Sequence, residues 1–138
     1  MPRENPPLKY DLLIRRGTLI DPAREIHAQQ DVAFADGTVA ATGKDLLVAD
    51  AREVIDADGL YVTPGLIDVH VHVYPGVSHF GIEPDPTCLA RGATTVVDAG
   101  SAGADTFPGF RKYVIEVSQT RILAQLNIAS HGMVSREV

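Results

Sequence analysis

The first sixty residues alternate short apolar runs with turn-forming residues, a pattern typical of strands in a sheet. Asp36-Gly37 separates two such runs, and a two-residue Asp-Gly turn is typical of a β-hairpin. A segment ending in Asp58-Gly59 separates residues 53–55 from residues 60–62, which predicts a second hairpin. No stretch here has helical periodicity over more than a turn. The pattern therefore predicts a small antiparallel sheet within residues 1–62.

The pattern changes after Thr63-Pro64-Gly65, where predicted strands begin to alternate with helix-compatible segments. We expect strands over 66–73, 94–98 and 121–130, and helices over 86–91 and 107–120. Equivalent strand positions recur at intervals of about 30 residues, which is the repeat of a βαβ unit. Residues 63–138 therefore predict an α/β fold in which parallel strands build either an open sheet or a barrel.

Either architecture needs more strands than the three predicted here. An eight-unit barrel takes about 250 residues, against the 138 of this chain. A parallel sheet that stops at its third strand leaves unpaired backbone groups along one edge. We therefore expect the sequence to be the N-terminal part of a larger protein.

Composition and charge narrow the range of functions. The chain is 45% apolar and 22% charged, so it can bury a core. Its net charge is −6, and it lacks the basic stripe that nucleic-acid binding requires. It has no membrane-length apolar run and no apolar stretch after its first residues, which argues against a membrane protein or a secretory signal. The single cysteine, Cys88, fits a reducing compartment. We expect a cytoplasmic protein that binds neither nucleic acid nor a membrane, with a homo-oligomer as one possible state.

The strongest chemical signal lies in the strand predicted over 66–73. Side chains alternate across a strand, so Asp68, His70 and His72 share one face, and the apolar residues between them share the face that suits packing beneath helices. Two imidazoles at this spacing can converge on one cation, and Asp68 could orient a histidine by accepting its ring N–H. About 0.18 His-x-His pairs arise by chance in such a sequence, so the pair alone is weak evidence. Burial of three polar groups on an apolar strand would be costly without a partner, which favours metal ligation.

Two segments also resemble a known family. Residues 63–72, with the pattern Pro-Gly-Leu-Ile-Asp-x-His-x-His after an Asp-Gly-punctuated β segment, resemble the start of the amidohydrolase superfamily of metal-dependent hydrolases. Residues 94–107 resemble its deacetylase subgroup, which is close to the dihydroorotases. The resemblance implies a TIM (β/α)₈ barrel with a flanking β-sandwich. Residues 1–62 would then be a sandwich segment, and residues 63–138 the first βα units of a truncated barrel.

The resemblance further implies one or two divalent metals, usually zinc, with His70 and His72 ligating the more buried one. Metal-bound hydroxide would attack the carbonyl carbon of an amide or acyl ester. The remaining ligands and the general base would follow later barrel strands, beyond Val138, so no catalytic residue is assigned. We expect a deacetylase-like hydrolase that acts on a small-molecule substrate, with a dihydroorotase-like cyclic amidase as the alternative. A non-catalytic truncated or interaction polypeptide is the alternative from another class.

Four further residues are weaker candidates. His79 lies in the loop after the first strand of residues 63–138 and His131 follows the third, where barrel enzymes build their substrate sites. A solvated loop histidine and a plain strand-end histidine are the alternatives. Asp98 ends the second strand, and capping of the loop at Gly100 is its favoured role. Cys88 is expected to pack in a helix rather than to act as a nucleophile.

Overall fold

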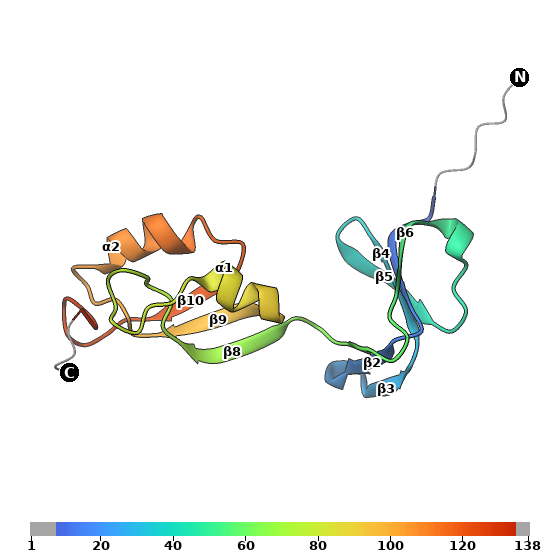
Figure 1. Cartoon of the computed structure of the whole chain (residues 1–138), viewed down its shortest axis with the longest axis horizontal. Coiled ribbons are helices and arrows are strands. Elements are labelled where there is room, and N and C mark those ends of the chain that lie inside the picture. Colours follow the sequence, from blue (N-terminus) through green and yellow to red (C-terminus); the bar gives the residue numbers. More distant parts are fainter. Residues whose placement is uncertain (1–7, 135–138) are drawn as a thin grey trace, which may run out of the picture. The chain divides into compact units, whose positions relative to one another are not determined.

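The computed structural model describes residues 8–134 and divides the chain into two compact units, Met1–Pro64 and Gly65–Val138 (Figure 1). Each unit has its own hydrophobic core, centred on Leu13 and Ala33 in the first unit and on Val73, Val96 and Phe110 in the second. Among the helices of the described residues, none is both long enough and apolar enough to cross a membrane.

The first unit contains two small sheets. The four-stranded sheet has the order β5-β4-β1-β6, and its strands are β1 (Tyr10–Arg15), β4 (Asp31–Ala35), β5 (Thr38–Gly43) and β6 (Ala51–Asp56). The three-stranded sheet has the order β3-β2-β7, with strands β2 (Thr18–Asp21), β3 (Ile26–Gln29) and β7 (Tyr61–Val62). Two single-turn 3₁₀ helices, Pro22–Arg24 and Val48–Asp50, complete the described part of this unit.

The predicted hairpin at Asp36-Gly37 is confirmed, because β4 and β5 pair antiparallel around it. Both turn residues have positive φ, 51° and 71°, as a type I′ turn requires. The second predicted hairpin is wrong: β6 pairs in parallel with β1, and β7 pairs in parallel with β2. The sheets are therefore mixed rather than antiparallel.

The parallel pairing arises because the segment β6–β7 runs beside the segment β1–β2 in the same direction. β1 and β2 are joined through Gly17, and β6 and β7 follow the same course beside them. A Cβ atom on Gly17 would lie 2.5 Å from Val62 Cγ2 and 3.1 Å from the Ala57 Cβ, so only glycine permits this approach. The Ala57 N–H donates to the Arg15 carbonyl oxygen at 2.9 Å, which joins the two segments where they pass from one sheet to the other.

The second unit is a three-stranded parallel sheet partly covered by helices. Its order is β10-β9-β8, with β8 (Leu66–Val71), β9 (Ala93–Ala99) and β10 (Arg121–Gln125). The helical segments are α1 (Pro84–Thr87), a 3₁₀ turn (Leu89–Arg91), and α2 (Phe107–Phe110), which continues as a π-helix (Arg111–Ile115). Figure 1 shows α1 and α2 on the same face of this sheet. The expected alternation of parallel strands and helices is confirmed.

Two helices and one strand have different bounds from those predicted. The helix predicted over 86–91 is two short pieces that start at Pro84 and stop at Gly92, whose φ of 92° ends the helix. The helix predicted over 107–120 ends at Ile115. The strand predicted over 121–130 stops at Gln125, because the Asn127 N–H donates to the Ala102 carbonyl oxygen in the loop after β9.

Candidate functional site

The predicted site residues lie at the carboxyl end of β8. Asp68 and His70 belong to the strand, and His72 follows its last residue. Asp68 and His70 are exposed and His72 is half-buried, so the expectation that all three are buried is wrong for the first two. The physical reason is that β8 is an edge strand of the described sheet and pairs only with β9.

The opposite face of the same strand is also only partly covered. Val71 and Val73 are buried in the core, with exposures of 8% and 0%. Ile67 and Val69 are 65% and 70% exposed, so the expectation that the whole apolar face packs beneath helices is wrong for these two. Within residues 8–134, the helices therefore cover the carboxyl end of β8 and leave its start open. The carboxyl end of β8, where His70 and His72 lie, is therefore packed into the core more fully than its amino end.

The two imidazoles are spaced as ligands of one cation would be. The ring centroids of His70 and His72 lie 5.6 Å apart, with an angle of 81° between the planes. For two imidazoles bound at a tetrahedral angle with Zn–N of about 2.0–2.1 Å, the centroids would be about 5.2 Å apart. The spacing therefore fits a shared divalent cation. No group of three or more His, Cys, Asp or Glu in the described residues could hold a metal ion, so His70 and His72 are a pair of candidate ligands without a third candidate beside them.

Asp68 makes a different contact from the one predicted. Its Oδ1 accepts the backbone N–H of His70 at 3.0 Å, and no histidine ring N–H donates to it among the hydrogen bonds of the described chain. The bond lies where the register of β8 against β9 shifts, between Asp68 and Val71. Asp68 thus satisfies a strand N–H at this irregularity and steadies the backbone that carries His70.

The ring of His72 is held by a residue that the sequence pattern does not single out. Its Nδ1 lies 3.0 Å from the hydroxyl oxygen of Ser101, and the direction of this hydrogen bond depends on the tautomer of the ring. Ser101 is fully buried in the loop after β9. No local sequence signal points to Ser101, because the contact joins residues 29 positions apart.

Asp98 caps the loop after β9 and joins two strands. It is fully buried, and its Oδ1 accepts the backbone N–H of Ser101 at 2.7 Å. Its Oδ2 accepts the backbone N–H of Val73 at 2.8 Å. Asp98 therefore caps its loop as predicted, but at the Ser101 N–H rather than at Gly100. In addition, the side chain ties the end of β8 to the loop after β9, and both ends of this tie lie beside His72.

The two loop histidines lie on segments that meet after β8 and β10. His79 is exposed, its ring centroid lies 3.8 Å from that of Phe80, and its backbone N–H donates to the Met133 carbonyl oxygen at 3.3 Å. His131 is exposed, and its carbonyl oxygen accepts the Thr106 hydroxyl at 3.1 Å. Phe80 is 58% exposed and its ring centroid is 5.8 Å from that of His72. The structure therefore places Phe80, which the sequence analysis did not select, beside His72.

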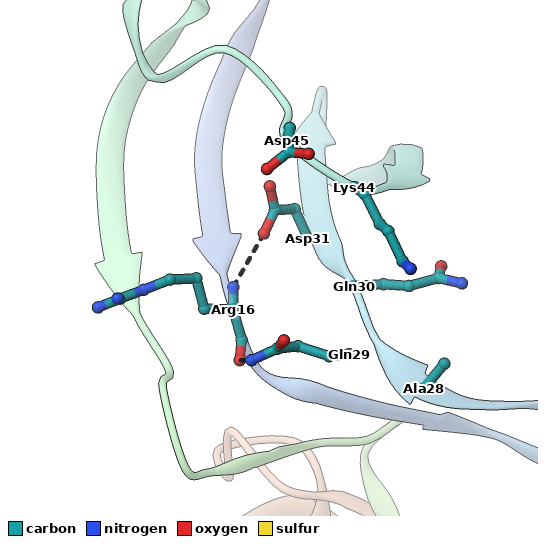
Figure 2. Close-up of a pocket in the computed structure, with 7 residues that line it drawn as sticks. All are labelled: Arg16, Ala28, Gln29, Gln30, Asp31, Lys44 and Asp45. Carbon is teal, nitrogen blue, oxygen red and sulfur yellow. Dashed lines mark hydrogen bonds between the residues drawn. The ribbon is translucent and has the colours of Figure 1, made fainter.

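A separate cavity of about 230 Å³ belongs to the first unit. Figure 2 shows its lining residues, which are Arg16, Ala28, Gln29, Gln30, Asp31, Lys44 and Asp45. The carboxylate of Asp31 accepts the backbone N–H groups of Arg16 at 2.9 Å and Leu46 at 3.0 Å, so both oxygens hold the chain together. The Arg16 side chain points away from the other residues drawn and pairs with Asp56 instead (Figure 2). This cavity is accordingly a structural junction.

Comparison with known proteins adds a family to this geometry. The model of the Amidohydrolase family matches residues 53–125. A deacetylase from Agrobacterium fabrum is 46% identical over 100 residues, which are 72% of this chain and 25% of that protein. The crystal structure of a dihydroorotase superposes with a TM-score of 0.79 and 37% identity, covering 90% of this chain and 32% of that one. An N-acyl-D-glutamate deacylase from Bordetella bronchiseptica, in complex with zinc and a phosphonate inhibitor, superposes with a TM-score of 0.54 and 35% identity, covering 68% and 19%. The chain spans about a quarter of the length of the curated relative.

Proposed function

The chain belongs to the amidohydrolase family, and from this membership we propose that it forms part of a metal-dependent hydrolase that cleaves an amide or acyl ester of a small molecule. The observation that carries the proposal is the pair of imidazoles, with centroids 5.6 Å apart, at the carboxyl end of a parallel strand. A deacetylase-like reaction is favoured by the 46% identity to a deacetylase.

We propose that His70 and His72 hold a divalent cation, for which zinc is the first candidate. Their spacing fits such an ion, and the deacylase that is 35% identical to this chain was crystallised with zinc. A bound cation would supply a Lewis acid for the substrate carbonyl group. Whether one or two ions bind depends on ligands outside the described pair. Asp68 would act indirectly, by holding the backbone N–H of His70 in place.

The proposed architecture places the substrate at the same end of the sheet. We propose that β8, β9 and β10 are the first three strands of a (β/α)₈ barrel, and that residues 1–62 belong to a flanking β-sandwich. Substrates of such barrels bind at the carboxyl ends of the strands. His79 and His131 lie in loops at that end and remain our candidates for substrate contact. The general base and further ligands would come from the part of the relatives' length that this chain does not span.

Two alternatives have specific support. A dihydroorotase-like cyclic amidase is favoured by the TM-score of 0.79 to a dihydroorotase structure. A non-catalytic role, in which the chain acts as an interaction polypeptide, is favoured by the exposed apolar side chains on the outer strands. These are Leu66, Ile67 and Val69 on β8 and Leu123 on β10. Metal-dependent hydrolysis by the 138-residue chain alone would exclude the non-catalytic alternative.

The metal site is tested with a double variant, His70→Ala with His72→Ala, and a matched control, His27→Ala. His27 is an exposed histidine of β3 in the first unit, so its loss removes an imidazole without touching β8. Zinc content is measured after equilibration with zinc and dialysis. We expect the double variant to lose the bound zinc and the control to retain it. Equal zinc content in all three proteins would exclude His70 and His72 as ligands.

Substrate class is tested by turnover assays in the presence of zinc. N-acetylated amino acids and a cyclic amide such as a hydantoin are compared under identical conditions. Release of acetate from the first class supports the deacetylase-like proposal, and ring opening of the second supports the cyclic amidase. Because the chain spans about a quarter of the curated relative, these assays also use any longer form of the protein isolated from its source.

A further inference from the structure

We propose that Ser101 is a positioning residue that fixes the imidazole of His72 by accepting its Nδ1–H, so that Nε2 is the nitrogen left for a cation. The inference deepens the proposed function and rests on it. It starts from the 3.0 Å separation between His72 Nδ1 and Ser101 Oγ. Histidines that ligate metals almost always donate their other ring N–H to a fixed acceptor, which sets the tautomer and the orientation of the ring.

Ser101 is itself held rigidly enough to serve as that acceptor. Its backbone N–H donates to Asp98 Oδ1 at 2.7 Å, and its carbonyl oxygen accepts the Met133 N–H at 3.0 Å. The preceding carbonyl oxygen, of Gly100, accepts the Asn127 side-chain amide at 2.9 Å. The loop after β9 is therefore bonded to the end of its own strand and to the segment after β10, and the hydroxyl has a defined position.

Close packing on the far side of the loop reinforces this position. Gly103 lies so near the following loop that a Cβ atom on it would collide with the carbonyl oxygens of Ala129 and Ser130. Gly132 has a φ of 73°, and a Cβ atom on it would collide with the Ser101 carbonyl oxygen. Two glycines thus allow the loops after β9 and β10 to touch. Ser101 is fully buried as a result, so bulk water does not compete for its hydroxyl.

The direction of this hydrogen bond decides which nitrogen of His72 is free. A neutral imidazole carries one N–H donor and one lone-pair acceptor, and a serine hydroxyl can meet either. When Ser101 Oγ accepts the Nδ1–H, the lone pair lies on Nε2, the only form in which neutral His72 can ligate through that atom. Free histidine prefers the opposite tautomer, with its proton on Nε2. Ser101 would therefore select the minor tautomer and hold it in the ligand orientation.

A nucleophilic role for the same serine fits the geometry less well. Ser101 is 0% exposed, so a substrate carbonyl has no access to its hydroxyl. The nearest carboxylate, Asp98, uses its two oxygens on the backbone N–H groups of Val73 and Ser101 rather than on the imidazole. The arrangement therefore lacks the oriented base that an activated serine requires.

The experiment compares Ser101→Ala with a matched control, Ser78→Ala, in the 138-residue chain. Ser78 is also a buried serine of the second unit, at 5% exposure, but its hydroxyl has no hydrogen-bond partner within residues 8–134. The first readout is the tautomer of His72 in metal-free protein at a pH where the ring is neutral, from ¹H–¹⁵N correlation spectra of the imidazole nitrogens. The second is zinc affinity, from competition with a chelator. Backbone amide spectra establish that each variant is folded.

We expect the wild type and S78A to show the Nδ1–H tautomer of His72. In S101A we expect a shift toward the Nε2–H tautomer and about 10- to 100-fold weaker zinc binding. An Nε2–H tautomer in the wild type overturns the inference even if S101A does not fold. A folded S101A with unchanged tautomer and zinc affinity also overturns it.

One further variant separates this inference from the proposed function. If His72→Ala binds zinc as tightly as the wild type, the proposed metal site fails. If His72→Ala loses zinc while S101A binds it normally, only the role of Ser101 fails.

Discussion

Removing the Asp98 carboxylate should destabilise the second unit by an amount that the structure allows us to work out. The side chain is 0% exposed and accepts two backbone N–H groups, from Val73 at 2.8 Å and Ser101 at 2.7 Å. In Asp98→Ala, both donors are left in the interior without an acceptor. In Asp98→Asn, one oxygen remains and the other position becomes an NH₂ donor that faces an N–H.

The expected magnitudes follow from the cost of orphaned polar groups. Each buried N–H that loses its acceptor costs about 1–3 kcal/mol. We therefore expect D98A to lower the free energy of unfolding by about 2–6 kcal/mol, and D98N by about 1–3 kcal/mol, since it orphans one donor instead of two. The control is Asp105→Ala, an exposed aspartate of the same unit whose carboxylate makes no hydrogen bond in residues 8–134. Such a surface change should stay within about 0.5 kcal/mol.

The assay is urea unfolding followed by ¹H–¹⁵N spectra, which report the two units separately. With a urea dependence of about 2 kcal/mol per M, a loss of 3 kcal/mol lowers the midpoint of the second unit by about 1.5 M. The first unit should keep its midpoint in every variant. If D98A unfolds at the same urea concentration as D105A, the two hydrogen bonds contribute little, and the account of Asp98 as the tie between β8 and the loop is wrong.

Two further predictions concern groups around α1. Thr120 Oγ–H, with the backbone N–H groups of Gln119 and Thr120, holds the pKa of Asp85 below the ordinary value of about 3.9. The contribution of the Asp85 carboxylate to the free energy of unfolding should therefore be complete above about pH 4. It should be lost as the pH falls through the lower pKa that Asp85 has in the folded state. The difference in urea midpoint between wild type and Asp85→Asn should be constant from pH 7 to 5 and shrink toward pH 2, and a pH-independent difference would contradict this. Burial, and then the Asp68 and Asp85 carboxylates, raise the pKa of the Cys88 thiol. At pH 8 a disulfide reagent should therefore modify Cys88 far more slowly in the folded chain than in the urea-unfolded chain. Equal rates in the two states would refute the burial of Cys88.

Local patterns in the sequence were sufficient for several features. The Asp36-Gly37 turn and the strands on either side of it follow from the φ preferences of two adjacent residues, and the hairpin is present. The 30-residue spacing of strand segments predicted parallel βαβ units, and β8, β9 and β10 pair in parallel. The resemblance of residues 63–72 to amidohydrolases is confirmed by a family match over residues 53–125.

Local patterns could not predict contacts between residues that are far apart in the sequence. β6 and β7 looked like a hairpin, but each pairs in parallel with a strand about forty residues earlier, because Gly17 lets Ala57 and Val62 approach. The apolar face of β8 looked fully buried, yet Ile67 and Val69 are exposed, since burial depends on what covers a strand and not on its alternation.

The site divides in the same way. The period of two residues along a strand was enough to place His70 and His72 together at one end of β8, because strand geometry is local. The partner of the His72 ring, Ser101, is 29 residues away, and only the pairing of β8 with β9 and the Asp98 tie bring it to 3.0 Å. The sequence by itself therefore selected the side chains that we propose to carry the chemistry. The tertiary structure decided what holds them, because a buried hydroxyl becomes a specific partner only when loops from separate strands pack against each other.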